Sequence, residues 1–138
     1  MGRKLPRNLD LALLFLRLSV GGLMLFHGYR KLTAGIDGIR AMVTDSGLPE
    51  QVSYGIYVGE VAAPLLLILG LYTRVAGLLV AITMAVSIWL GFGMDAFTLN
   101  EYGGVAVELN LLYFFGALAL FFSGAGRYSV RKGIPWWD

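Results

Sequence analysis

Residues 75–92 read VAGLLVAITMAVSIWLGF, and this stretch decides the class of protein. It contains no charged residue, and its length is close to the ~20 apolar residues that cross the hydrocarbon core of a bilayer. A helix on the surface of a soluble bundle keeps a polar face opposite its apolar stripe. Residues 75–92 have no such face, which excludes a soluble four-helix bundle and indicates a membrane span.

Further apolar segments lie on either side of this span, at residues 11–31, 52–73 and 103–123. Only 14% of the 138 residues are charged and 57% are hydrophobic, whereas about a quarter of the residues of a soluble domain are charged. We therefore predict an all-α fold, a single transmembrane domain over residues 1–138 that forms an antiparallel bundle of four membrane helices. Apolar residues at helical spacing between residues 36 and 43 predict a short amphipathic helix in the first outer loop.

The basic residues predict the orientation of the chain. Cytoplasmic loops of membrane proteins are enriched in Lys and Arg. With both termini in the cytoplasm, the outer side holds three cations, Arg30, Lys31 and Arg40. The inner side then holds seven cations, namely Arg3, Lys4, Arg7, Arg74, Arg127, Arg131 and Lys132. We therefore predict a multi-pass protein with its N- and C-termini inside.

The residues that carry most redox and metal chemistry are scarce. The chain has no cysteine and one histidine, His27. This excludes disulfides, thiol nucleophiles, Cys-ligated zinc, Cys-bound iron–sulfur clusters and a His-rich metal or haem centre within one copy of the chain. We therefore predict no metal site and no intrinsic cofactor, so that any redox-active group would be a borrowed molecule such as a quinone.

Ionisable residues inside the predicted spans are the candidates for a functional site, because such groups are costly in a membrane and usually face the bundle interior. Helical rise places Glu60 near the midplane, within reach of Arg17. His27 and Lys31 lie at the outer end of the first span, where Glu108 is expected to meet His27, or Lys31 if the stem of Lys31 bends inward. Pro64 cannot donate to the carbonyl of Glu60, which predicts a local irregularity and open space there. The predicted ligand pocket consists of Arg17, His27, Lys31, Tyr57, Glu60 and Glu108.

A purely structural interpretation of the same residues remains open. Buried ion pairs and polar networks can serve only to fix the register of helices. Asn110 is equally consistent with a simple hydrogen bond between two helices. Tyr57 is equally consistent with packing or with an aromatic belt at the membrane interface.

Several short motifs along nearly the whole chain resemble the DoxX family of small four-helix membrane proteins. They are Arg17-Leu18 with Gly21, Phe26–Leu32 (FHGYRKL), Gly47-Leu48-Pro49, Glu60, Leu69–Arg74 (LGLYTR), Glu108 and Gly124–Ser129 (GAGRYS). The sequence departs from the family pattern at Ala125, where proline is common, and at Arg131, near which an aspartate is often found. The resemblance implies a bacterial inner-membrane protein, with Arg17, His27, Lys31, Glu60, Arg74 and Glu108 at family positions.

Some members of this family are subunits of thiosulfate:quinone oxidoreductase, and others are linked with defence against oxidants or sulfur stress. The resemblance therefore implies a redox-linked subunit that binds a quinone or a similar lipophilic molecule and receives electrons from a partner protein. A membrane scaffold that holds a partner or forms homo-oligomers is a second hypothesis. A transporter of a small molecule or lipid is a third, and the sequence leaves open whether the protein is an enzyme.

Overall fold

The computed structural model describes residues 6–130, so the predicted inner-side cations Arg3, Lys4, Arg131 and Lys132 lie outside the described residues. The α-helices are α1 (Arg7–Ala34), α2 (Asp37–Asp45), α3 (Gly55–Tyr57), α4 (Ala63–Leu69), α5 (Thr73–Gly91) and α6 (Glu108–Ser123). Two short 3₁₀ helices, Glu50–Tyr54 and Gly93–Asp95, and one π-helical turn, Val58–Ala62, complete the regular structure in this range, apart from an isolated bridge between Leu99 and Val105.

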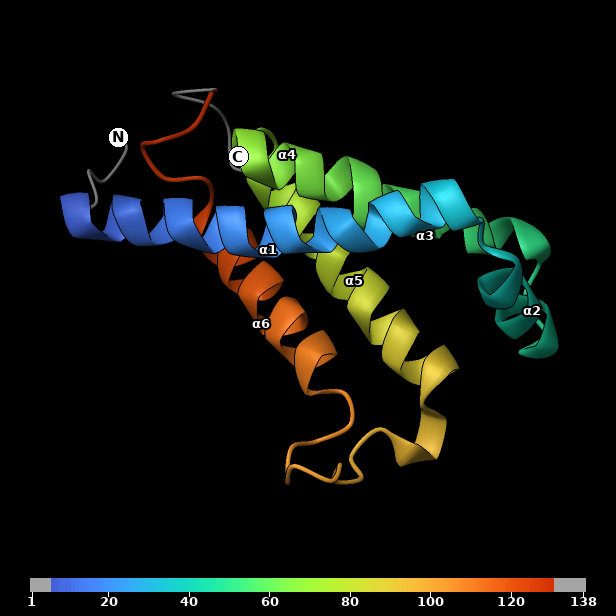
Figure 1. The fold of residues 1–138 in the computed structure, drawn as a ribbon. Coiled ribbons are helices and arrows are strands. Elements are labelled where there is room, and N and C mark those ends of the chain that lie inside the picture. Colours follow the sequence, from blue (N-terminus) through green and yellow to red (C-terminus); the bar gives the residue numbers. More distant parts are fainter. Residues whose placement is uncertain (1–5, 131–138) are drawn as a thin grey trace.

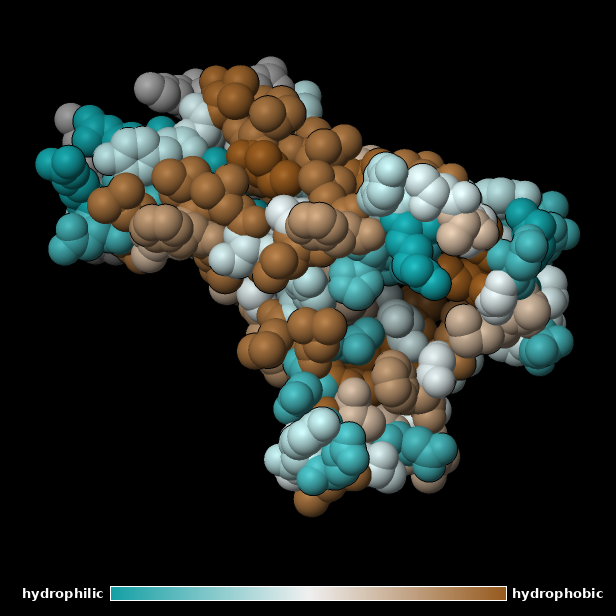
Figure 2. Space-filling model, in the orientation of Figure 1, coloured by the Kyte–Doolittle hydropathy of each residue, from teal (hydrophilic) through white to brown (hydrophobic). Residues whose placement is uncertain are grey.

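The predicted all-α membrane fold is confirmed. Three helical stretches in the described range are long and apolar enough to cross a membrane, namely Arg7–Ala34, Glu50–Leu69 and Thr73–Gly91. The fourth, α6, is apolar but has only 16 residues, which corresponds to about 24 Å of helix. Figure 2 shows apolar residues over α1 and α4, whereas hydrophilic residues gather at the extremities of the molecule.

The helix α6 begins five residues later than the predicted start at residue 103, because the preceding residues fold back on themselves. The amide of Asn100 donates to Gly104 O (2.7 Å) and that of Ala106 donates to Thr98 O (2.8 Å). Gly103 takes a φ of 84°, a left-handed conformation that glycine adopts without strain. These backbone groups are therefore satisfied within a small hairpin instead of in a helix.

The second membrane span is not a regular α-helix. It runs from a 3₁₀ turn through α3 into the π turn Val58–Ala62 and only then into α4. The π turn contains Glu60 and ends two residues before Pro64, whose ring nitrogen has no hydrogen to give to the Glu60 carbonyl. The irregularity predicted at Pro64 is thus present, and π turns inside helices are frequent at functional sites.

Glycines allow the helices to approach closely. On α1, a Cβ added to Gly21 would lie 2.8 Å from Pro64 O, and one added to Gly28 would collide with Glu60 O. On α5, a Cβ added to Gly77 would lie 2.6 Å from Ala117 O of α6. The helices therefore pack as two pairs, α1 with the second span and α5 with α6.

The two pairs diverge from one another. Figure 1 shows the α5–α6 pair meeting α1 and α4 near the end that carries residue 130, and extending away from α1 toward the loop between α5 and α6. The core at the meeting point consists of buried apolar residues from all four spans, including Leu13, Met24, Leu67, Val80, Ala117 and Leu120. The divergence leaves an angle between α1 and α5, and Figure 2 shows hydrophilic side chains there.

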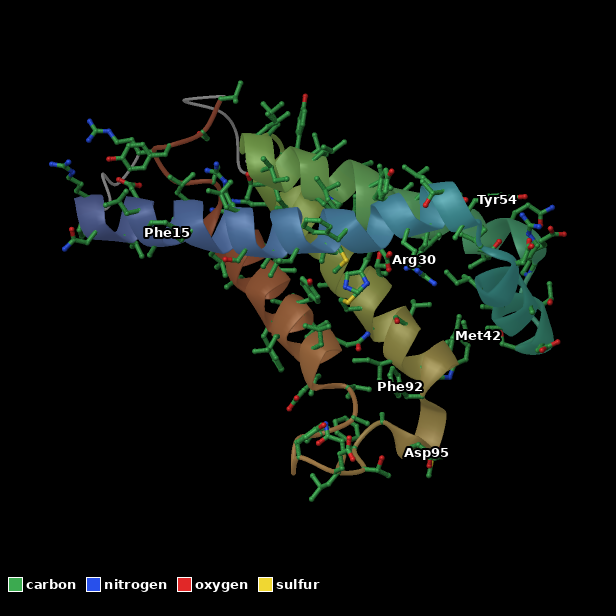
Figure 3. All side chains as sticks on the ribbon, in the orientation of Figure 1. Phe15, Arg30, Met42, Tyr54, Phe92 and Asp95 are labelled. Carbon is green, nitrogen blue, oxygen red and sulfur yellow. The ribbon has the colours of Figure 1, made fainter. Side chains whose placement is uncertain are left out.

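The predicted amphipathic helix in the first loop is present as α2. Val43 is buried, whereas Met42 is exposed. Arg40 of this helix pairs with Glu50 (3.0 Å) and lies over the ring of Tyr54. Figure 3 shows Met42 and Tyr54 together at the end of the molecule that α2 occupies.

Candidate functional site

The prediction that Arg17 meets Glu60 is wrong. The Arg17 side chain, 1% exposed, instead donates hydrogen bonds to backbone carbonyls. Its Nε donates to Leu67 O (3.0 Å), Nη2 to Ile68 O (3.3 Å), and Nη1 to Ala125 O (2.6 Å) and Tyr128 O (2.8 Å). Two of these acceptors lie in the last turn of α4, which ends at Leu69, where carbonyls no longer have the amide donors of a continuing helix.

Arg74 donates hydrogen bonds in the same way to the C-terminal carbonyls of α6. Its Nη1 donates to the carbonyls of Phe121 (2.9 Å) and Phe122 (2.6 Å), which belong to the last turn of that helix. A cation at a helix C-terminus also interacts favourably with the helix dipole. Arg17 and Arg74 therefore hold the ends of two spans together, and neither lines the candidate site described below.

The partner of Glu60 is Lys31. The Lys31 Nζ lies 2.5 Å from Glu60 Oε2, and the two side chains are 21% and 6% exposed. The π turn delivers the carboxylate to this position, while the direct contact between Gly28 and the Glu60 carbonyl brings α1 close enough for Lys31, one turn further along α1, to reach it. The pair joins α1 to the second span and is close to electrically neutral as a unit.

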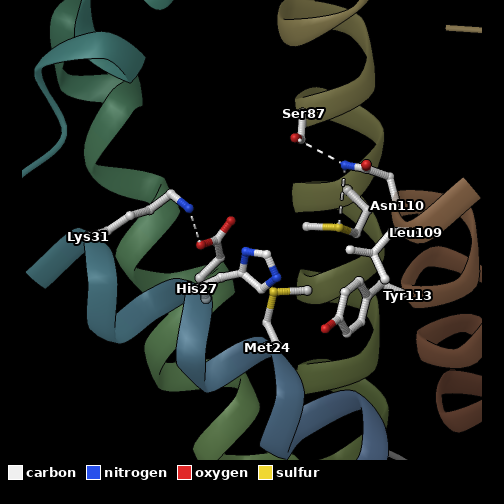
Figure 4. A pocket seen from close by; sticks show the side chains of 9 residues that line it. Met24, His27, Lys31, Ser87, Leu109, Asn110 and Tyr113 are labelled. Atoms are coloured by element: carbon white, nitrogen blue, oxygen red, sulfur yellow. Dashed lines mark hydrogen bonds and ion pairs between the residues drawn. The ribbon is translucent and has the colours of Figure 1, made fainter. Parts of the chain in front are cut away.

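A cavity of about 120 Å³ lies beside this ion pair. Figure 4 shows it from close by, with α1 on one side and α6 on the other. All four spans contribute to its wall. The lining residues are Met24, His27 and Lys31 of α1, Glu60 of the π turn, Met84 and Ser87 of α5, and Leu109, Asn110 and Tyr113 of α6.

The polar groups of the wall are oriented by contacts between helices. The ring of His27 meets the ring of Tyr113 edge-on, with centroids 6.0 Å apart and an interplanar angle of 88°. The amide of Asn110 donates to Ser87 Oγ (3.3 Å), so the predicted interhelical hydrogen bond of Asn110 is present. These contacts leave hydrogen-bonding groups of α1 and α6 facing one cavity (Figure 4).

Only three of the six residues predicted for the pocket line the cavity: His27, Lys31 and Glu60. Arg17 lies at the end of α4, as described above. Tyr57 is half-buried and lies outside the lining.

The predicted meeting of Glu108 with His27 or Lys31 is wrong. Glu108 is exposed in the first turn of α6, and its carboxylate packs against Gly104. Lys31 pairs with Glu60 instead, and His27 packs against Tyr113. The late start of α6 explains the difference, because it puts Glu108 at the end of a helix and not inside one.

Six lining residues were missed by sequence reasoning. Met24, Met84 and Leu109 are apolar, so nothing distinguishes them from the other residues of an apolar span. Ser87 and Tyr113 are ordinary residues of membrane helices and do not by themselves indicate a pocket. Asn110 gave a signal as the amide inside the last span. Its position three residues before Tyr113 puts both on one helix face, which could have indicated a polar wall on α6.

The arrangement can bind a small molecule that presents hydrogen-bond acceptors. His27, Lys31, Asn110 and Tyr113 all carry donors, and Glu60 supplies a carboxylate next to them. The remaining wall is apolar, which suits a ring or an alkyl group. A binding site for a compact, mostly apolar molecule with polar oxygens matches this mixture of groups.

A family model described as DoxX matches residues 12–93, which is more than half of the chain. No curated protein and no solved structure matches the chain. The matched range runs from within α1 to the end of α5, so it includes every cavity residue except Leu109, Asn110 and Tyr113 of α6.

Proposed function

The chain belongs to the DoxX family, and from this membership and the cavity together we propose that it binds a quinone, or a similar lipophilic small molecule that carries carbonyl groups, within the membrane. The observation that supports the proposal is the cavity itself. It brings His27, the Lys31–Glu60 pair and the Asn110–Tyr113 face of α6 around one volume at membrane depth.

The size of the cavity limits what enters it. A cavity of about 150 Å³ lined by apolar side chains accommodates benzene, so the 120 Å³ here takes at most one ring edge with its carbonyl oxygen, and the ring substituents and isoprenoid tail of a quinone would lie outside it. His27 and Leu109 are exposed at its edge. A tail would leave past these residues into the surrounding lipid, which offers it an apolar environment.

The donors of the wall fit the carbonyl oxygens of a quinone head group. His27 and Lys31 come from α1, whereas Asn110 and Tyr113 come from α6 on the other side of the cavity (Figure 4). The rings of His27 and Tyr113 are in contact, with centroids 6.0 Å apart, so a head group would lie beside this pair and accept hydrogen bonds from a donor of α1 and from Asn110 of α6. The thioethers of Met24 and Met84 and the side chain of Leu109 provide apolar contact for the ring.

The chemistry that a quinone supplies when bound is the carriage of electrons and protons. The residues of the cavity would orient the quinone and transfer protons to or from its oxygens. The imidazole of His27 would donate a hydrogen bond to a quinone oxygen. The Glu60 carboxylate, whose Oε2 lies 2.5 Å from Lys31 Nζ, would supply or accept a proton next to that oxygen. Electrons would come from a redox partner protein, since the chain has no cysteine to hold an iron–sulfur cluster.

We further propose that the protein resides in a bacterial inner membrane with both termini in the cytoplasm. Arg7 at the start of α1, Arg74 at the start of α5 and Arg127 after α6 support this orientation under the positive-inside rule. The amide of Arg127 donates to Asp10 Oδ1 (2.9 Å), which fixes the segment after α6 to the beginning of α1. A partner protein or a second copy of the chain would then reach this basic end from the cytoplasm.

A scaffold function is the second candidate, and one observation favours it. Arg17, Arg74, Lys31 and Glu60 all make internal contacts that join spans, so fixing the fold accounts for each of them without a ligand. A packing role does not account for the open volume beside Lys31 and Glu60, and for this reason ligand binding is preferred.

The proposal is tested by titrating the protein in lipid nanodiscs with a short-tailed ubiquinone analogue, using empty nanodiscs as the blank for partition into lipid. His27→Leu and Asn110→Leu each remove one donor from opposite walls of the cavity. Loss of one hydrogen bond, about 0.5–1.5 kcal/mol, weakens binding about 2- to 12-fold. Ser19→Ala is the control, because Ser19 is exposed on α1 and bonds only its own helix.

Binding by the wild type that weakens in both cavity variants, and not in Ser19→Ala, would support the proposal. Quinone uptake equal to that of empty nanodiscs would overturn it. Uptake that is the same in all four proteins, with a lower melting temperature only in the cavity variants, would favour the scaffold.

A further inference from the structure

Two methionines of the cavity wall would give a bound quinone only apolar contact, although each carries a sulfur atom with free lone pairs. Met24 of α1 and Met84 of α5 are 1% and 4% exposed, and both line the cavity. The other methionines in the described range, Met42 and Met94, are exposed. The two buried thioethers of residues 6–130 therefore meet at the same volume.

Packing alone does not explain this arrangement. Methionine is flexible and normally fills irregular gaps in a core. Here a volume of about 120 Å³ stays open against both side chains. Two adaptable side chains next to unfilled space are expected when that space is a binding site.

The third potential donor is His27. It lies three residues after Met24 on the same face of α1, and Figure 4 shows its imidazole beside the thioether of Met24. Thioethers select Cu(I), and imidazole binds copper as well. We propose that Met24, His27 and Met84 form a binding site for a soft monovalent metal ion, Cu(I).

The charges around the cavity favour a monovalent ion over a divalent one. Lys31 neutralises Glu60, so no free carboxylate of this pair is left to compensate a double charge. Within residues 6–130, no group of three or more His, Cys, Asp and Glu side chains is placed to hold a metal ion. The prediction of no metal site from the sequence considered those donors alone, and the thioethers of methionine were not among them.

Met84 is held in place for this role by Asn110. The Asn110 amide lies 3.9 Å from Met84 Sδ, while it also donates to Ser87 Oγ. A thioether sulfur has two lone pairs, so one of them can face the Asn110 amide while the other binds a metal ion. His27 is exposed at the edge of the cavity, so an ion can enter there without passing through the core.

The test is an anaerobic titration of the purified protein with Cu(I), in which a chromophoric Cu(I) chelator competes for the metal. Met24→Leu and Met84→Leu keep the volume and apolar character of the side chain and remove the sulfur. Each should weaken binding by at least about 10-fold, because even outer-shell partners of a metal contribute 10- to 100-fold. Met42→Leu and Met94→Leu are matched controls that remove exposed thioethers outside the cavity.

X-ray absorption of the Cu(I)-loaded wild type gives an independent measurement that needs no variant. Sulfur and nitrogen scatterers in the first shell, with sulfur lost in Met24→Leu, would establish the site. An absence of Cu(I) binding, or an affinity that falls equally in Met24→Leu and Met94→Leu, would overturn the proposal. The proposal does not rest on quinone binding, and each can fail without the other.

Discussion

Replacing Gly28 by alanine tests the contact that places Lys31 beside Glu60. The added Cβ would collide with Glu60 O and lie 2.8 Å from Glu60 C and 2.8 Å from Val61 Cγ2. Two of these three atoms are backbone, so no side-chain rotation relieves the overlap. Only a separation of α1 from the π turn Val58–Ala62 makes room for the methyl group.

Two opposing effects determine how much Gly28→Ala changes the free energy of unfolding. Overpacking of a tight interface costs about 1–3 kcal/mol, and the rigid backbone here puts the cost at the upper end. Removal of a glycine from a helix interior returns about 0.5–1 kcal/mol. The free energy of unfolding of Gly28→Ala should therefore fall by about 2 kcal/mol relative to the wild type.

Gly22→Ala provides the matched control within α1. A Cβ at Gly22 has no atom within 4 Å, so only the gain in helix propensity remains, about 0.5–1 kcal/mol. Both variants and the wild type can be unfolded by SDS in mixed micelles and followed by circular dichroism. A Gly28→Ala protein as stable as the wild type, or equal shifts in both variants, would refute the packing described for α1 and the π turn.

Two other predictions concern the buried charges. Arg17→Lys should lower the free energy of unfolding by about 3 kcal/mol, because a single ammonium replaces few of the charged hydrogen bonds, which are worth about 1.5–3 kcal/mol each. Unchanged stability in the SDS titration would show that the four carbonyl contacts are not formed. Lys31→Met and Glu60→Gln should each destabilise by about 3–5 kcal/mol. The double variant should recover part of that loss in a double-mutant cycle, and strictly additive losses would mean that the two side chains do not interact.

The membrane spans could be predicted from the sequence because their signal is local. Runs of apolar residues define a span whatever the rest of the chain does, and the predicted α5 (75–92) agrees with the observed Thr73–Gly91 to within two residues at each end. The position of an irregularity at Pro64 was also predictable, since the missing N–H is a property of proline itself.

The partners of the buried charges could not be predicted in the same way. Counting residues gives the height of a side chain along its helix, but not which helix it faces or where a neighbouring helix ends. Arg17 is satisfied by two carbonyls of the last turn of α4, which ends at Leu69, and by two carbonyls of the segment after α6. Glu108 was placed inside a span, whereas the hairpin of residues 98–106 delays α6 until Glu108 itself.

The cavity was the least predictable feature, because it depends on how far the α5–α6 pair diverges from α1 (Figure 1). Three predicted residues, His27, Lys31 and Glu60, line it. The wall contributed by α5 and α6 consists of ordinary span residues, apart from Asn110, and only the packing of the helices shows that they share one volume.

Native mass spectrometry with lipid extraction, on wild-type protein and Asn110→Leu purified gently from the same membranes, tests most directly whether the cavity holds a lipophilic molecule. Binding in the cavity predicts a quinone or another small lipophile that is retained by the wild type and depleted from Asn110→Leu. A wild type that carries no small molecule, or one that shares its bound lipids equally with Asn110→Leu, would contradict it.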